Sequence, residues 1–267
     1  MTNKSRMDYS VLDRAEVTQF LFHPRPEMNG GMSAANARNV MIPVEKELAL
    51  GGRFHMSGSS DPNILFFHGN GEIVSDYDEL GPIYNRLNIN FLPVDYRGYG
   101  RSDGIPTVTA MMRDSHAVFD FTRNWLQSEG FAGPLILMGR SLGSASAMEL
   151  VFHYPDTVAG LIVESGFAFA APLLELLGID IGSIGFEEKD GFRNLDKIGA
   201  FEGPTLIIHA QNDNIIPFSD GEALYSACTA SEKTLLKIQG ANHNDLLHVG
   251  FSEYMRAVKN LANTVNR

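Results

Sequence analysis

A G-x-S-x-G pattern gives the strongest indication of chemistry in this 267-residue chain. The pattern, Gly139–Gly143, directly follows the apolar run Leu135–Met138 and directly precedes a stretch with helical spacing. A strand–turn–helix of this kind holds a serine in a strained turn, and the flanking glycines relieve the crowding around it. We therefore predict that Ser141 is a nucleophile above the carboxyl edge of a sheet, with the N-terminus of the next helix facing any negative charge that forms beside it.

A serine hydroxyl is a poor nucleophile unless a base removes its proton, and the usual base is a histidine oriented by a carboxylate. His243 lies in the loop Gly240–Asn244, between the last predicted strand and the last predicted helix, where it would open beside the serine. We therefore predict that His243 is the base. The other histidines after the serine fall within helices or at a strand end, where packing or surface exposure explains them: His153, His209 and His248.

The carboxylate is predicted from chain order, because folds of this kind place the acid between the serine and the histidine. Asp213 follows a predicted strand, 72 residues after Ser141 (213 − 141) and 30 before His243 (243 − 213). Glu164, at the end of the preceding strand, remains the alternative acid, since a carboxylate there can also reach a histidine. Asp245 is too close to the histidine in sequence and is interpreted as a helix cap.

An oxyanion hole, two backbone N–H groups facing the developing negative oxygen, is the third requirement of this chemistry. One N–H is predicted to be that of Leu142, directly after the nucleophile. The other is predicted to be that of Asn70, in the glycine-containing loop His68–Gly71, where the backbone can approach a substrate closely. His68 itself is interpreted as a structural residue of that loop.

The rest of the chain alternates strands and helices, which predicts a mainly parallel sheet with helices on both faces. We interpret residues 1–38 as an extension that packs on the domain, with turn signals at Pro24, Pro26 and Asn29–Gly31, and residues 39–267 as one α/β domain. The predicted strands are Val40–Val44, Leu48–Met56, Asn63–Phe67, Ile89–Val94, Pro134–Met138, Leu161–Val163, Pro204–His209 and Thr234–Ile238. The predicted helices are Tyr77–Leu87, Val108–Gln127, Ser141–His153, Phe218–Cys228 and Asp245–Val265.

One interval, about residues 167–203, is too long for an ordinary connection between strands. It contains a run of leucines with helical spacing, followed by apolar residues separated by glycines. We interpret it as a small lid over the carboxyl edge that lines an apolar acyl pocket. The side chains predicted to bind substrate are Leu173, Leu176, Leu177 and Ile184.

The chain has 21 Lys and Arg residues and 32 Asp and Glu residues, which gives a formal net charge of 21 − 32 = −11. This negative charge disfavours nucleic acid and anionic membrane surfaces as partners. The first residues do not resemble a signal peptide, and no run is apolar enough to span a membrane, so we expect a cytoplasmic protein without stable membrane association. The single cysteine, Cys228, excludes an intrachain disulfide. We find no nucleotide-binding motif and no metal-site spacing, and therefore expect no cofactor and no metal. The oligomeric state is left open.

The chain resembles the α/β-hydrolase superfamily from about Val40 onward, through the G-R-S-L-G pattern, the His68–Gly71 loop, Asp213 and His243. Within it, the chain resembles the Bem46 and ABHD13/ABHD17-type branch, by these motifs and by Phe22–Arg25 near the N-terminus. The resemblance implies an eight-stranded, mostly parallel sheet and a serine hydrolase that acts on esters or thioesters.

Several alternatives to this interpretation stay open. The same three residues could cleave a peptide or a carbon–carbon bond, and the fold also occurs in non-catalytic binding proteins. A lipase that works at a membrane surface is disfavoured by the short lid and the acidic charge. Some eukaryotic members of the branch remove acyl groups from proteins and depend on cysteine-rich N-termini, which this chain does not resemble.

Overall fold

The computed structural model describes residues 7–28 and 36–266 of the chain. The turn predicted at Asn29–Gly31 lies outside these residues. Among the described residues, no helix combines the length and the apolar character needed to cross a bilayer.

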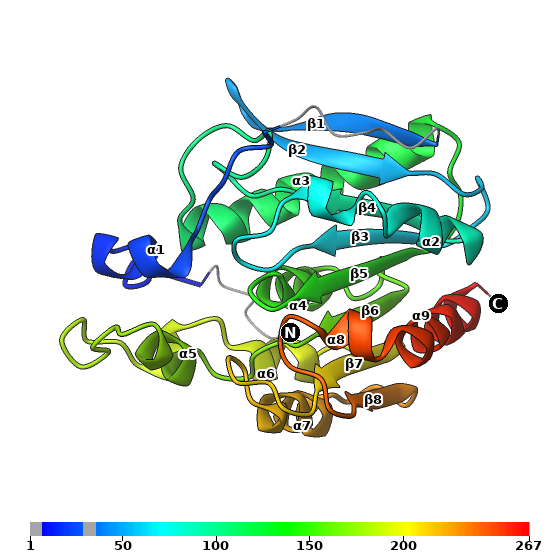
Figure 1. Ribbon diagram of the computed structural model, residues 1–267. Helices are drawn as coiled ribbons and strands as arrows, with labels where there is room; N and C mark the ends of the chain where they lie inside the picture. The colour runs from blue at the N-terminus through cyan, green and yellow to red at the C-terminus, as the bar shows by residue number, and fades with distance from the viewer. Residues whose placement is uncertain (1–6, 29–35, 267) are drawn as a thin grey trace.

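One eight-stranded sheet forms the centre of the molecule, as the sequence predicted (Figure 1). Its strand order is β1-β2-β4-β3-β5-β6-β7-β8. The pairs β1–β2 and β2–β4 are antiparallel, and all the other neighbouring pairs are parallel. The strands are β1 (Ala37–Glu45), β2 (Leu48–His55), β3 (Asn63–Phe67), β4 (Asn90–Val94), β5 (Leu135–Arg140), β6 (Gly160–Glu164), β7 (Thr205–Ala210) and β8 (Lys233–Ile238).

Helices cover both faces of the sheet, which explains the continuous apolar runs of the central strands. In β3, Leu65 and Phe67 pack in one buried cluster, whereas Ile64 and Phe66 pack in the other, because successive side chains point to opposite faces. The first face carries α3 (Val108–Ser128), α4 (Gly143–His153), α6 (Asn194–Gly199) and α7 (Phe218–Ala227). The second carries α2 (Gly81–Arg86), α8 (Leu246–Val249) and α9 (Phe251–Val265).

Two predicted helices differ from the structure at glycines. The predicted helix Tyr77–Leu87 is a short 3₁₀ turn, η1 (Val74–Tyr77), followed by α2, which begins only at Gly81 with a proline in its first turn. The predicted helix Asp245–Val265 is divided into α8 and α9 at Gly250. A Cβ at Gly250 would lie 2.5 Å from Ile238 Cγ2, so a glycine is needed where the chain passes this close to β8.

Two segments lie beyond the carboxyl ends of β3 and β5. One contains α1 (Ala15–Leu21), and Leu12, Val17 and Phe22 from it are buried in the core of the first face. The other connects β6 to β7 and contains α5 (Ala170–Leu176), η2 (Glu188–Asp190) and α6. Both segments are therefore close to the edge where the sequence places its candidate catalytic residues.

His55, at the end of β2, is a buried titratable group with little to stabilise its charged form. Among the described residues, neither ring nitrogen has a hydrogen-bond partner, and a Cβ at the neighbouring Gly81 would lie 2.3 Å from the ring. Burial lowers the pKa of His55 from its ordinary 6.5 to about 4; the negative charge of Asp78, 4.0 Å away, opposes the shift, and Arg53 adds to it.

We expect this histidine to weaken the fold in acid. Because its pKa is lower in the folded than in the unfolded chain, its contribution to stability is present above pH 6.5 and is lost as the pH falls toward 4, a loss of about 3 kcal/mol. Urea unfolding of His55→Gln should show a correspondingly shallower pH dependence than the wild type. His248→Gln, an exposed histidine, is the control, and equal slopes for wild type and His55→Gln would contradict the assignment.

Candidate active site

Ser141 occupies the turn between β5 and α4 in a backbone conformation that residues with a side chain rarely adopt. Its φ is +51°, in the left-handed region, and its N–H donates to the Glu164 carbonyl at 2.9 Å. The flanking glycines are sterically required. A Cβ at Gly139 would lie 2.3 Å from the Gly143 carbonyl oxygen, and one at Gly143 would lie 2.1 Å from the Phe67 carbonyl oxygen.

The structure brings Ser141, His243 and Asp213 into one hydrogen-bonded series. Ser141 Oγ lies 3.1 Å from His243 Nε2, and His243 Nδ1 lies 2.7 Å from Asp213 Oδ2. Since an ionised carboxylate can only accept, the Nδ1–H must donate to Asp213. In the neutral imidazole this leaves the Nε2 lone pair facing the serine hydroxyl, the arrangement that a base requires.

Asp213 is held in its charged form. Burial alone would raise its pKa, but the hydrogen bond from His243, the charge of that histidine when protonated and two backbone N–H groups together lower it. These N–H groups belong to Ile215 and Ile216 and lie 3.0 and 2.9 Å from Asp213 Oδ1. A carboxylate in this state favours a protonated His243 during a reaction.

The alternative acid and the other histidines lie outside this series, although His209 Nε2 lies 3.7 Å from Asp213 Oδ2. Glu164 forms an ion pair with Arg140 at 3.1 Å and accepts a hydrogen bond from Tyr254 at 2.6 Å. His209 is buried, with its Nε2 2.8 Å from the Ile216 carbonyl oxygen. His153 is at the end of α4, and His248 is exposed on α8.

The two N–H groups predicted for an oxyanion hole come from different loops. Leu142 precedes the first residue of α4, and Asn70 lies in the loop after β3. The side chain of Asn70 accepts hydrogen bonds from the His23 N–H at 2.8 Å and the Tyr99 hydroxyl at 2.7 Å. The N-terminal segment therefore helps to fix this loop, and sequence reasoning missed that role because the contact joins residues 47 positions apart.

His68, at the start of the same loop, is buried and has structural partners. Its Nδ1 lies 2.8 Å from the Gly69 carbonyl oxygen, and its Nε2 lies 3.3 Å from Asp95 Oδ1. Asp95 also accepts a hydrogen bond from the Val74 N–H at 2.9 Å. These contacts connect the loop after β3 to the loop after β4.

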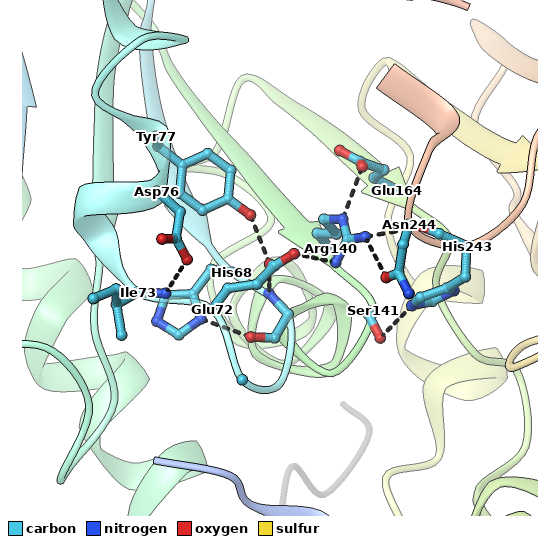
Figure 2. A network of polar contacts seen from close by, with 12 residues as sticks. His68, Glu72, Ile73, Asp76, Tyr77, Arg140, Ser141, Glu164, His243 and Asn244 are labelled. Atoms are coloured by element: carbon cyan, nitrogen blue, oxygen red, sulfur yellow. Dashed lines mark hydrogen bonds and ion pairs between the residues drawn. The ribbon is translucent and has the colours of Figure 1, made fainter. Parts of the chain in front are cut away.

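A buried arginine joins three parts of the site (Figure 2). Arg140, the variable residue before the serine, forms ion pairs with Glu72 and Glu164. Its guanidinium also donates to the His243 carbonyl oxygen at 2.8 Å. Glu72 in turn accepts from the Gly69 N–H at 2.7 Å. The sequence signal was a charged residue at the end of an apolar strand, which needs buried counter-charges.

His243 is one of the residues that line a cavity of about 160 Å³. Its wall combines polar groups of the arginine network with apolar and aromatic side chains of the second face. Its lining includes Glu72, Tyr77, Arg140, Glu164, His243 and Tyr254.

The four side chains predicted to bind substrate do not line this cavity. Ile184 is buried, Leu173 and Leu177 are half-buried, and Leu176 is 56% exposed. The N-terminus of α5 is held by Glu188, whose carboxylate accepts from the N–H groups of the two residues that begin the helix, at 2.7 and 2.9 Å.

The sequence is similar to a family model and to several known proteins. Residues 58–177 match the family model described as "Serine aminopeptidase, S33". Human alpha/beta hydrolase domain-containing protein 17B is 33% identical over 205 residues, which cover 73% of this chain and 64% of the human protein. The chain thus spans less than two thirds of that relative. An uncharacterised protein of Mycobacterium tuberculosis is 28% identical over 219 residues, 78% of this chain and 73% of the other.

Solved structures agree with this at the level of the fold. The esterase Pf2001 of Pyrococcus furiosus has a TM-score of 0.74 at 16% identity, covering 92% of this chain and all of that one. Est1E of Butyrivibrio proteoclasticus, solved with ferulic acid, has a TM-score of 0.66 at 19% identity, covering 84% and 98%. The chain thus has the α/β-hydrolase fold, and its sequence is similar to proteins of that family.

The close packing at Gly143 leads to a prediction about the serine turn. In Gly143→Ala, the added methyl group would meet two backbone carbonyls, so α4 must shift. We expect the free energy of unfolding to fall by about 1–3 kcal/mol. We expect labelling of Ser141 by a fluorophosphonate to slow by about 100-fold, since small displacements of reacting groups have effects of that size.

Gly182→Ala is the matched control, because its new methyl group would have only Asp180 Oδ1 within 4 Å, at 3.3 Å. A Gly143→Ala protein that reacts at the wild-type rate would show that the turn tolerates a side chain there.

Proposed function

We propose that this protein hydrolyses carboxylic esters or thioesters through an acyl-enzyme intermediate on Ser141. The observation that carries the proposal is the series from Ser141 Oγ to His243 to Asp213, built on a serine with a positive φ between β5 and α4. A nucleophile, a base and a group that orients the base stand in the order that acyl transfer requires.

In the first step, Ser141 Oγ attacks the acyl carbonyl carbon while His243 Nε2 takes the hydroxyl proton. Asp213 keeps the imidazole in the required tautomer and stabilises its positive charge. The tetrahedral intermediate collapses as His243 protonates the leaving alcohol or thiol. In the second step, His243 takes a proton from water as the water oxygen attacks the acyl-enzyme carbonyl. The second tetrahedral intermediate collapses as the bond from the acyl carbon to Ser141 Oγ breaks and His243 returns the proton to Oγ, which releases the free acid.

The negative oxygen of each tetrahedral intermediate would be stabilised by the backbone N–H groups of Leu142 and Asn70. The first lies at the N-terminus of α4, where the helix dipole also favours negative charge. The second lies in a loop whose side-chain and backbone contacts hold it in place before substrate arrives. Donors fixed in advance lower the barrier because they need no reorganisation during the reaction.

The acyl group in this proposal is apolar, and the segment 167–203 acts as a lid. Its support is the apolar composition of the segment, the position of α5 beyond the carboxyl edge of the sheet, and the exposure of Leu176. Est1E of Butyrivibrio proteoclasticus, which has a similar fold, was solved with ferulic acid. Leu173, Leu177 and Ile184 would contribute to the wall of the pocket.

Cleavage of an amide is the second candidate, favoured by the description of the matching family model as a serine aminopeptidase. The same series of side chains could attack a peptide bond, with His243 protonating a leaving amine. Amino-acid p-nitroanilides tested beside p-nitrophenyl esters separate the two activities.

The first test is a comparison of initial rates on p-nitrophenyl butyrate for wild type and Ser141→Ala. Removing the nucleophile should lower kcat by at least about 10⁴-fold, since loss of a triad member removes the covalent route. His248→Ala, at an exposed histidine, should retain the wild-type rate.

Equal turnover by wild type and Ser141→Ala would exclude Ser141 as the nucleophile. If the wild type hydrolyses neither esters nor anilides and also resists a fluorophosphonate, the proposal fails in favour of a binding protein on this fold.

The apolar pocket gives a separate prediction about chain length. Across p-nitrophenyl acetate, butyrate and octanoate, kcat/KM should rise, because each buried methylene contributes about 0.8 kcal/mol. Leu177→Ser should flatten this series while leaving the rate on acetate within about twofold. A wild-type profile that is flat or falls with chain length would contradict the pocket but not the triad.

A further inference from the structure

A second group of polar side chains lies between α3 and α4. His116 on α3 faces Glu149 and His153 on α4, and the glutamate is buried. The His116 and His153 Nε2 atoms lie 3.4 and 3.1 Å from the same oxygen, Glu149 Oε1. One possible ligand atom from each residue lies within 4.8 Å of the others.

These distances suit one small metal ion. A tetrahedral ion with bonds of about 2.0–2.1 Å holds its ligand atoms roughly 3.3 Å apart, close to the two separations seen here. Glu149 and His153 are four residues apart on one helix and therefore share a face. His116 completes the set from the neighbouring helix.

Contacts with neighbouring residues orient the possible ligand atoms of His116 and Glu149. His116 Nδ1 lies 2.9 Å from the Tyr154 hydroxyl, an outer partner of the kind that orients metal-binding imidazoles. The second oxygen of Glu149, Oε2, pairs with the buried Lys197 at 2.6 Å and accepts from Tyr9 at 3.3 Å. Lys197 therefore neutralises the outer oxygen, while Oε1 is directed at both imidazoles.

The cluster opens into a cavity of about 340 Å³. The cavity is lined by Met7, Tyr9, Thr109, Met112 and Arg113 together with the three cluster residues. It gives an ion a path from solvent and room for a water as a fourth ligand, as in sites with three protein ligands.

We propose that His116, Glu149 and His153 bind one divalent transition metal ion of the zinc type. Two imidazoles and one carboxylate favour Zn²⁺ and its neighbours over Ca²⁺ or Mg²⁺, which prefer oxygen ligands. The ion would connect α3 to α4 on the first face of the sheet. The sequence did not reveal the site because 33 residues separate His116 from Glu149. The proposal is independent of the hydrolase activity.

The test uses the full chain without a histidine tag, freed of metal by a chelator and then titrated with Co²⁺ at neutral pH. We expect a visible absorption band that saturates at one equivalent and disappears when Zn²⁺ is added. Zn²⁺ should also raise the thermal unfolding midpoint, since an ion that binds only the folded chain stabilises it.

His116→Ala and His153→Ala should each weaken Co²⁺ binding by more than about 100-fold, because even outer partners of metal ligands contribute ten- to a hundredfold. His248→Ala, on an exposed histidine of α8, should bind like the wild type. If either alanine variant fails to fold, His153→Gln, at a half-buried position that keeps a similar volume, provides the same comparison.

Binding that is absent in the wild type, or equally strong in the folded histidine variants, would overturn the proposal. The group would then be an ion-pair cluster between the two helices. Removal of the metal should leave ester hydrolysis unchanged. Failure of the metal-binding test would therefore not count against the proposed hydrolase activity, and absence of hydrolysis would not count against the metal site.

Discussion

The site depends on the buried charge of Arg140. A guanidinium away from water costs several kcal/mol unless it is paired and hydrogen-bonded, and its partners come from three separate places: Glu72 after β3, Glu164 at the end of β6, and the backbone of His243. The energetic need to satisfy one side chain therefore fixes the relative positions of the loop after β3, the serine turn and the loop that carries His243. Arg140 is the last residue of β5 and directly precedes Ser141, so the same strand positions both residues.

The strained turn and the arginine network complement each other. A non-glycine residue at φ +51° is less stable than an extended one, and the conformation persists because its surroundings leave no other. The Ser141 N–H is bonded to the Glu164 backbone, and the glycines on either side are packed against backbone. Since Arg140 and Glu164 are paired, relaxation of the turn would also disturb a buried ion pair.

The sequence was sufficient for those features that depend on local patterning. The alternation of predicted strands and helices indicated a mainly parallel sheet, the resemblance to the α/β-hydrolases implied eight strands, and both are confirmed. The serine turn could be expected because five consecutive residues encode it. Three other features arise from contacts between residues far apart in the chain. These are the hydrogen bond from His23 to Asn70, the ion pairs of Arg140, and the contact between His116 and Glu149. Periodicity reports which face of an element is buried, but not which polar groups meet there, so these features required the structure.

The N-terminal segment links the two polar centres of the molecule. His23 holds Asn70 beside the candidate oxyanion hole, and Tyr9 contacts Glu149 in the cluster between α3 and α4. Both residues precede the part of the chain that matches the family model, and Asp213 and His243 follow it. The matched region thus contains Ser141 and the strands β3, β4, β5 and β6, whereas the candidate base, the candidate acid and part of the support for the loop after β3 come from outside it. Differences in function between this protein and others of the same fold are therefore expected mainly in these flanking segments and in residues 167–203, because the central strands are constrained by packing on both faces.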